Sequence, residues 1–147
     1  MLATLERLRA ALQPLGYPVH LLYAEGPDDS THPPVPYLAL EVDPGPTPDE
    51  LPLCDPGMTI QFRLQVRAVG YPADSPVKVQ QRVRGVLAPG RQPTRLVGGG
   101  RVIDVLFLGA EVHTMPDRDM TAANLNRHPS WGLDAYDVHV QATAPTP

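Results

Sequence analysis

Two histidines and two aspartates between residues 113 and 128 are the groups whose types and spacing could support catalysis or metal binding. His113 and His128 bracket the run Asp117-Arg118-Asp119. A histidine beside a carboxylate can move a proton near neutral pH, and both side chains can ligate a transition metal. The spacing lacks the His-x-x-x-His or Cys-x-x-Cys arrangement of metal sites, so a solvated loop with locally paired charges is the simpler interpretation. The sequence therefore predicts no catalytic residue, no metal ligand and no cofactor.

The remaining polar motifs lead to the same conclusion. The run Gly98-Gly99-Gly100 lacks the Lys-Ser/Thr continuation of a phosphate-binding loop and is typical of a tight turn. The acidic pairs Asp28-Asp29 and Asp49-Glu50 lie among prolines, without the apolar wall that tunes a carboxyl group for acid catalysis. The single cysteine, Cys54, cannot form a disulfide within the chain. We therefore expect a protein that is not an enzyme.

The formal net charge of -4 hides an uneven distribution along the chain. Residues 1–55 hold nine acids and two bases, residues 56–101 one acid and eight bases, and residues 102–147 six acids and two bases. The net acidic balance disfavours a dedicated duplex-DNA binder, because phosphate neutralisation needs a basic domain. Oppositely charged flanks instead favour contacts between copies of the chain. The residues expected at such contacts are Arg63, Arg67, Lys78, Arg82, Arg84, Asp28, Asp29, Asp49 and Glu50.

Two helices and one long strand have the clearest patterns. Leu5, Leu8 and Leu12 recur at helical spacing and predict a helix over residues 2–13. Strict alternation over residues 59–69 predicts a strand with one apolar and one wet face. Ser75-Pro76 has the chemistry of an N-cap and a first helical residue, which predicts a second helix over residues 76–87.

The second helix is basic on its outer side. Lys78, Arg82 and Arg84 recur along it, and Arg91 follows it. A row of like charges of this kind forms a solvated face as readily as a contact surface, so both interpretations stay open.

The other segments complete the expected fold. Shorter strands are expected at residues 19–23, 37–42, 95–97, 101–108 and 133–142. The glycine run predicts either a hairpin of the third and fourth strands or a flexible loop before the fourth. Nine of the nineteen prolines lie in residues 27–56, which predicts long loops at 26–36 and 44–57; a third loop is expected at 115–130. This order predicts an α+β fold: a mixed, mostly antiparallel sheet with two amphipathic helices packed on one face and long Pro-rich loops. Residues 1–143 are expected to form a single domain, and residues 144–147 a short flexible C-terminal tail.

The sequence offers no segment that suits a membrane or a secretory signal. It contains no run of about 18 apolar residues. Glu6, Arg7 and Arg9 interrupt the stretch that a signal peptide would need to keep apolar. We therefore expect no membrane partner and a protein that stays in the cytoplasm where it is made.

Three features of this layout occur together. They are the Leu-rich opening helix at residues 2–15, the Pro-rich approach to Pro36-Tyr-Leu-Ala-Leu40, and the alternating strand at 60–69 that turns through Gly70 into the helix beginning Ser75-Pro-Val-Lys. In this layout, which continues to a final strand at 131–142, the chain resembles the tail-terminator, or tail-completion, family of siphophages. The loop at 44–57 departs from the leanest form of the pattern and is interpreted as an insertion.

The resemblance implies a virion structural protein without catalytic residues. Its subunits would form a hexameric ring that caps the tail tube, ends tube polymerisation and joins the tail to the head. The implied partners are further copies of the chain, the tail tube protein and a head–tail connector protein. DNA would only pass through the lumen, which we expect to be lined by polar or acidic residues. The protein would be found in the virion tail or neck after assembly in the host cytoplasm.

Other functions remain open at this point. The chain could be a neighbouring head–tail connector or minor tail protein, for which twelvefold symmetry is the family's expectation beside the portal. It could also be a small monomeric protein-binding module, which would need an exposed apolar groove. An enzyme would require His113, Asp117, Asp119 and His128 to converge on one pocket.

Overall fold

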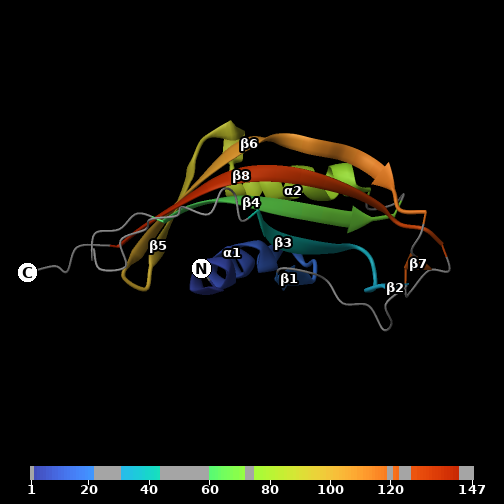
Figure 1. The fold of residues 1–147 in the computed structure, drawn as a ribbon, viewed down its shortest axis with the longest axis horizontal. Helices are drawn as coiled ribbons and strands as arrows, with labels where there is room; N and C mark the ends of the chain where they lie inside the picture. The colour runs from blue at the N-terminus through green and yellow to red at the C-terminus, as the bar shows by residue number, and fades with distance from the viewer. Residues whose placement is uncertain are drawn as a thin grey trace, which may run out of the picture.

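The computed structural model of the chain describes residues 2–21, 31–43, 60–71, 75–118, 121–122 and 127–142. Figure 1 shows a long sheet with two helices against it. In chain order the elements are α1 (Leu2–Leu12), η1 (Gln13–Leu15), β1 (Val19–Leu21), β2 (Thr31–His32), β3 (Tyr37–Asp43), β4 (Ile60–Gly70), α2 (Pro76–Leu87), η2 (Pro89–Arg91), β5 (Thr94–Gly98), β6 (Arg101–Pro116), β7 (Thr121–Ala122) and β8 (Ser130–Ala142).

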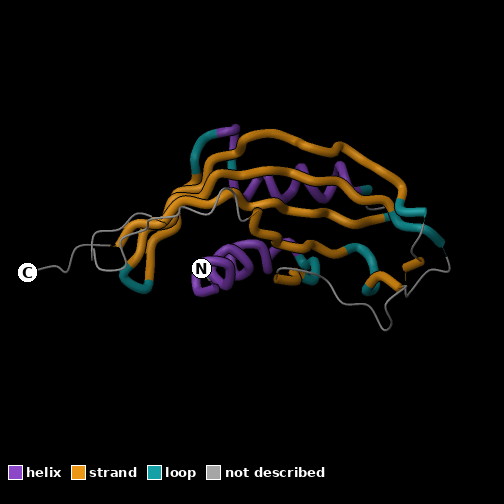
Figure 2. Tube along the Cα trace, viewed as in Figure 1, coloured by secondary structure: helices purple, strands orange, loops and turns teal. Residues whose placement is uncertain are grey.

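The main sheet has six strands in the order β1-β3-β4-β8-β6-β5. β1 and β3 pair in parallel, and every other pair in this sheet is antiparallel. Figure 2 shows the strands curling together along the long axis of the molecule. β2 and β7 form a separate two-stranded parallel sheet. The predicted α+β class, with a mixed and mostly antiparallel sheet, is confirmed.

β4 is the central strand, and it has the two faces that its alternating sequence predicts. Phe62, Leu64 and Val66 are buried, whereas Arg63 is exposed and Arg67 half-buried. β4 pairs with β8 from Ile60↔Val140 to Gly70↔Ser130, so the same alternation continues onto the neighbouring strand. One face of the sheet is therefore apolar, and the other is polar except at one end, where Tyr37, Val69 and Trp131 form a small second apolar cluster.

Both helices cover the apolar face. The predicted stripe of α1 is buried at Leu5, Leu8 and Leu12, and α2 buries Val79 and Val83 in the same core cluster as β3, β4, β6 and β8. In the view of Figure 1, α2 lies behind β4 and β8. Each fully buried leucine or valine contributes about 1.5–3 kcal/mol relative to an exposed one, so this packing fixes the helices to the sheet. The predicted two-helix layer is confirmed.

Local signals set the start of α2 and the hairpin between β5 and β6. The Ser75 hydroxyl accepts a hydrogen bond from the Lys78 backbone N–H at 3.5 Å, and proline occupies the first helical position. Gly99 and Gly100 have φ values of 62° and 70°, the backbone of a two-residue hairpin turn that most residues avoid. The predicted N-cap is confirmed, and of the two alternatives for the glycine run the structure has the hairpin.

The bounds of the loop expected at 115–130 are nearly right, but the strands on either side of it are longer than predicted, and β7 lies within it. β6 runs on past residue 108 to Pro116, and β8 begins at Ser130 instead of residue 133. Its pairing with β8 has irregular register between Phe107 and Gly109 and again between Ala110 and Met115. Extra residues at such bulges break the period of two, which is why the alternation ends in the sequence while the strand continues.

Other boundaries differ by a few residues. The first helix ends at Leu12 and continues as η1, because Pro14 cannot extend a regular helix. Two residues of the loop expected at 26–36 form β2. Residues 44–57 and the predicted C-terminal tail lie outside the described residues. Among the helices that the structure describes, none is long and apolar enough to cross a membrane.

Candidate functional site

Of the four residues considered for catalysis or metal binding, the three that the structure describes are not gathered into one site. Asp117 follows β6, and its backbone N–H donates to the Pro129 carbonyl at 2.9 Å, which places it beside His128 at one end of the sheet. His113 instead lines a pocket on β6. Asp119 lies outside the described residues. In the described ranges, no group of three or more His, Cys, Asp or Glu side chains could hold a metal ion.

The predicted basic contact residues divide between the two layers of the fold. Arg63 and Arg67 lie on the polar face of the sheet, on β4. Lys78, Arg82 and Arg84 lie on α2, on the other side of the sheet. The acidic candidates Asp28, Asp29, Asp49 and Glu50 all lie outside the described residues. Contact between these groups on different copies stays a prediction, but the five bases do not form one continuous patch.

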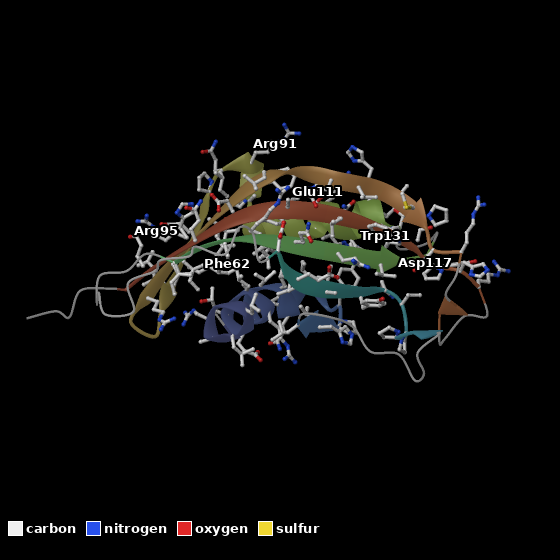
Figure 3. All side chains as sticks on the ribbon, viewed as in Figure 1. Phe62, Arg91, Arg95, Glu111, Asp117 and Trp131 are labelled. Atoms are coloured by element: carbon white, nitrogen blue, oxygen red, sulfur yellow. The ribbon has the colours of Figure 1, made fainter. Side chains whose placement is uncertain are left out.

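The arginines on the polar face are paired with acids of neighbouring strands. Arg63 on β4 forms a salt bridge with Glu111 on β6. The Arg67 Nη2 donates to the Glu41 carboxylate on β3 at 3.1 Å, and its guanidinium lies 5.1 Å from the centre of the Trp131 ring. Figure 3 labels Glu111 and Trp131 on this sheet. These charges are largely compensated within one subunit.

The same pairing continues toward the hairpin end of the polar face. The Asp137 carboxylate accepts from the Gln61 amide at 2.9 Å and lies 2.8 Å from the His139 Nε2. The Arg95 Nε donates to Asp104 at 2.7 Å, and this hydrogen bond holds the pKa of the Asp104 carboxyl below its usual value. The polar face is therefore a ladder of paired charges and amides.

Arg84 belongs to a buried cluster under α2. Its Nε and Nη2 donate to the two carboxylate oxygens of Asp134 at 2.7 and 2.6 Å. Asp134 is 1% exposed and also accepts from the Gln80 amide at 3.1 Å. The hydrogen bond to Asp134 is the main reason that the pKa of Arg84 is raised. Arg84 thus links α2 to β8, and its charge is largely neutralised by Asp134 within the subunit.

Arg82 and Lys78 lie on the outer side of α2. Both side chains are exposed. The Arg82 guanidinium donates to the Tyr17 hydroxyl and lies 5.7 Å from the centre of that ring. The partner is a hydroxyl and not a carboxylate, so this contact positions the guanidinium without forming an ion pair.

A pocket lined partly by arginines lies next to α2. Arg84, Arg91 and His113 share a pocket of about 300 Å³ with Phe107, Leu108, Gly109 and Ala110. Arg91 is exposed, and in the described part of the chain its guanidinium makes no ion pair. Figure 3 labels it at the top of the view, beside β6. This pocket combines cationic groups with apolar walls.

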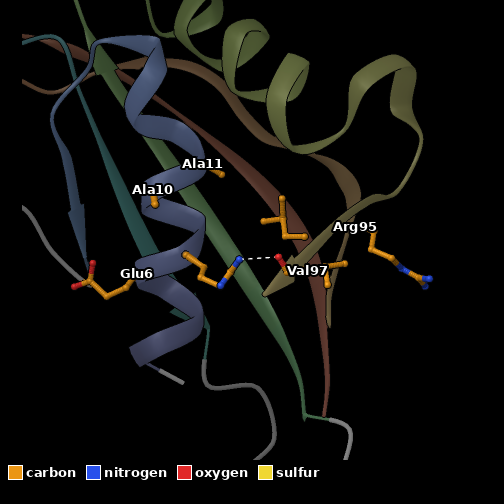
Figure 4. A pocket seen from close by; sticks show the side chains of 7 residues that line it. Glu6, Ala10, Ala11, Arg95 and Val97 are labelled. Carbon is orange, nitrogen blue, oxygen red and sulfur yellow. Dashed lines mark hydrogen bonds between the residues drawn. The ribbon is translucent and has the colours of Figure 1, made fainter. Parts of the chain in front are cut away.

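A larger groove lies between α1 and β5. It measures about 590 Å³ and is lined by Glu6, Arg7, Ala10, Ala11, Arg95, Leu96 and Val97. Figure 4 shows the Arg7 guanidinium crossing it to the Val97 carbonyl, a hydrogen bond of 2.8 Å. The small side chains of α1 leave this space open, and the exposed Val97 forms part of its wall. The groove offers an apolar contact surface with charges at its edge.

Two functional features escaped the sequence analysis. Asp134 has the same parity on β8 as the buried Tyr136 and Val138, and a carboxylate on the apolar side of a strand needs a cationic partner. That parity is a signal that could have identified the Arg84 pair. The pocket at Arg91 has no comparable signal, because it depends on where α2 ends relative to β6.

No family model matches the chain, and neither the curated proteins nor the solved structures include a match to it.

Proposed function

We propose that this chain is a structural subunit that closes into a hexameric ring, and that the ring caps the tail tube of a long-tailed phage. In this role it ends tube polymerisation and joins the tail to the head. The tail tube protein binds one side of the ring and the head–tail connector protein the other. DNA only passes through the lumen, and no membrane is involved.

The observation that carries the proposal is the uncompensated positive charge of one region. Residues 75–101, which include α2, η2 and β5, contain six basic residues and no acid. Asp134 and Asp104 neutralise two of them, Arg84 and Arg95. Arg82 bonds only to a tyrosine hydroxyl, and Arg91 has no acidic partner within the described ranges. The region therefore keeps a net positive charge at its surface.

Unlike charges on two flanks suit a ring of identical subunits. A head-to-tail contact joins one patch on each copy to a different patch on the next, and rotation of such a contact closes a ring. Nine of the sixteen acids lie in residues 1–55, so the chain supplies the opposite charge as well. Charge complementarity of this kind steers encounter and sets register more than it adds affinity.

The polar face of the sheet supports passage of DNA past the subunit. Its arginines are held by acids of adjacent strands, as Arg63 is by Glu111 and Arg67 by Glu41. A channel wall of unpaired arginines would bind the phosphates of DNA and slow its passage. A wall whose arginines are paired with acids attracts the phosphates only weakly. This face is therefore suited to line a lumen.

Electron microscopy of the purified chain, alone and with the tail tube protein of the same virion, tests the proposal. We expect sixfold rings that bind tube ends, so that tubes grown with the chain are shorter than tubes grown without it. Twelvefold rings would assign the chain to the connector instead. Single particles without effect on tube length would refute the proposal.

The groove between α1 and β5 favours a second candidate, a monomeric protein-binding module. Ala10, Ala11 and Leu96 give it the apolar lining that such a module needs. Under this alternative the chain stays monomeric at high concentration, and Ala10→Glu abolishes partner binding without changing the mass of the particle.

A further inference from the structure

The pocket at Arg91 lies on a free edge of the sheet. β5 pairs with β6 only from Arg101 to Val105. From Leu106 to Pro116, β6 is paired with β8 on one side, and no strand in the described part of the chain pairs with it on the other. An unpaired edge presents backbone N–H and C=O groups to another chain.

The same edge is protected against indiscriminate strand addition. The register irregularities at Gly109 and between Ala110 and Met115 interrupt the regular ladder. Bulges of this kind discourage long sheet extension and leave only short stretches of backbone accessible. A segment that binds here must therefore be short and must be held by its side chains, and the pocket is the place where side chains can enter.

Arg91 is held in an unusual conformation at the wall of this pocket. Its φ is 62°, and among the described residues no other non-glycine has a positive φ. A residue with a Cβ is strained in this region, and such strain gathers at binding and active sites. Because Asp134 engages Arg84, the Arg91 guanidinium is the charge that remains available to a ligand.

We propose that the pocket formed by Arg91, Arg84, Phe107, Leu108 and His113 binds residues 46–53 of a neighbouring copy. This inference rests on the proposed ring, and it assigns the contact that joins adjacent subunits. In the proposed contact the Asp49 and Glu50 carboxylates would pair with Arg91, and the leucines at 51 and 53 would pack against Phe107 and Leu108.

The composition of residues 46–53 decides the choice of this segment. Its sequence, Pro-Thr-Pro-Asp-Glu-Leu-Pro-Leu, combines two carboxylates with two leucines, which matches a pocket of guanidinium and apolar walls. Its three prolines restrict φ, so less conformational entropy is lost on binding. The other acidic pair, Asp28-Asp29, is flanked by proline and serine and offers no apolar side chain next to its charges.

Variants of each side separate this contact from general effects of charge. Arg91→Gly removes the guanidinium and suits the positive φ, so the fold is kept. Arg118→Gly removes one exposed charge outside the pocket and is the matched control. We expect Arg91→Gly and the double variant Asp49→Asn/Glu50→Gln to dissociate the ring, whereas Arg118→Gly leaves it intact. Rings that persist both in Arg91→Gly and in Asp49→Asn/Glu50→Gln overturn the inference.

Mixing the two variants tests whether the contact joins different copies. Arg91→Gly copies keep an intact segment, and Asp49→Asn/Glu50→Gln copies keep an intact pocket. Equal amounts should combine into heterodimers that cannot close, detected by light scattering after size-exclusion chromatography. If the segment occupied the pocket of its own chain, the mixture would stay monomeric, and the inference would be wrong.

A peptide measurement gives a result that does not depend on ring formation. The probe is a labelled synthetic peptide of residues 46–53, titrated into the Asp49→Asn/Glu50→Gln protein, whose pocket is free of its own segment. We expect binding that weakens by about tenfold when Arg91→Gly is added, the size of one charge-assisted hydrogen bond. Arg91-dependent binding together with a wild type that assembles, but not as six chains, would keep the inference and refute the ring, whereas a wild type that stays one chain would refute both. Absence of peptide binding, or Arg91-dependent binding of a DNA duplex in its place, refutes the inference while leaving the ring to its own test.

Discussion

Replacement of Arg84 by methionine should destabilise the subunit far more than the same replacement of Arg82. Both arginines lie on α2 two residues apart, and methionine keeps the aliphatic part of the side chain. Arg84 makes two short hydrogen bonds to Asp134, which is 1% exposed, whereas Arg82 is exposed and bonds to a tyrosine hydroxyl. The pair compares a buried ion pair with a surface cation on the same helix.

The magnitude follows from the charge that is left behind. Breaking a buried ion pair by removing one partner costs about 3–5 kcal/mol. The Arg84 side chain is 28% exposed, and Asp134 keeps its hydrogen bond from Gln80, so the cost is discounted. We expect Arg84→Met to lower the free energy of unfolding by about 2–4 kcal/mol, and Arg82→Met by less than about 1 kcal/mol.

Urea denaturation of the two variants measures these values. A third variant, Arg84→Met/Asp134→Asn, removes the unpaired carboxylate and should regain part of the stability lost by Arg84→Met alone. Equal stability of Arg84→Met and Arg82→Met would refute the reasoning, as would a double variant that is less stable than Arg84→Met. The result also decides how assembly is tested, because a charge reversal at Arg84 would unfold the subunit before it reported on contacts.

Three further predictions concern glycines and titrating groups. Gly132→Ala should lower the free energy of unfolding, measured by urea denaturation, by about 2 kcal/mol or more, because its Cβ would lie 2.7 Å from a backbone oxygen of β6. Gly85→Ala on the exposed side of α2 should instead raise the free energy of unfolding by about 0.5–1 kcal/mol. Similar effects at the two sites would contradict the packing. Burial raises the pKa of the Tyr136 and Tyr37 hydroxyls, so their contribution to folding stability is complete below about pH 10 and is lost as the pH rises further. In thermal melts, the melting temperature of the Tyr136→Phe/Tyr37→Phe variant should fall less above pH 10 than that of the wild type. An equal fall would argue against this reasoning. Burial, with a smaller effect of a nearby arginine, lowers the pKa of His20 from 6.5. Its contribution to folding stability is therefore present above pH 6.5 and is lost on acidification. An NMR titration of His20 should give a midpoint below 6.5, and a higher midpoint would contradict the burial.

The elements with complete local signals could be predicted from the sequence. The Leu5, Leu8 and Leu12 stripe, the Ser75 N-cap and the alternation on β4 each need only neighbouring residues to be interpreted. The hairpin at Gly99 and Gly100 is specified by the positive φ that glycine permits. In each case the structure has the element within a few residues of the predicted bounds.

The second half of β6 could not be predicted, because its bulges remove the local pattern. Between Gly109 and Met115 the extra residues change which side chains face the core, so no period of two survives. Only its pairing with β8, a segment distant in sequence, identifies this stretch as a strand. The free edge and the pocket at Arg91 depend on that pairing and were missed for the same reason.

The candidate contact residues illustrate what composition can and cannot reveal. Charge counts identify a basic region, but they do not separate Arg84, which is committed to Asp134, from Arg82, which is exposed. Parity along β4 places Arg63 on the polar face, yet its salt bridge with Glu111 depends on strand order. Partners that are distant in sequence decide which charges remain for another subunit.

The native mass of the purified particle tests the central claim most directly. Mass spectrometry under non-denaturing conditions counts the 16.0 kDa chains in one assembly. The proposed ring predicts a single dominant species of six chains, which assembles more slowly as the salt concentration rises because unlike charges steer the encounter. A species that remains one chain at every protein concentration and at low salt would contradict the account.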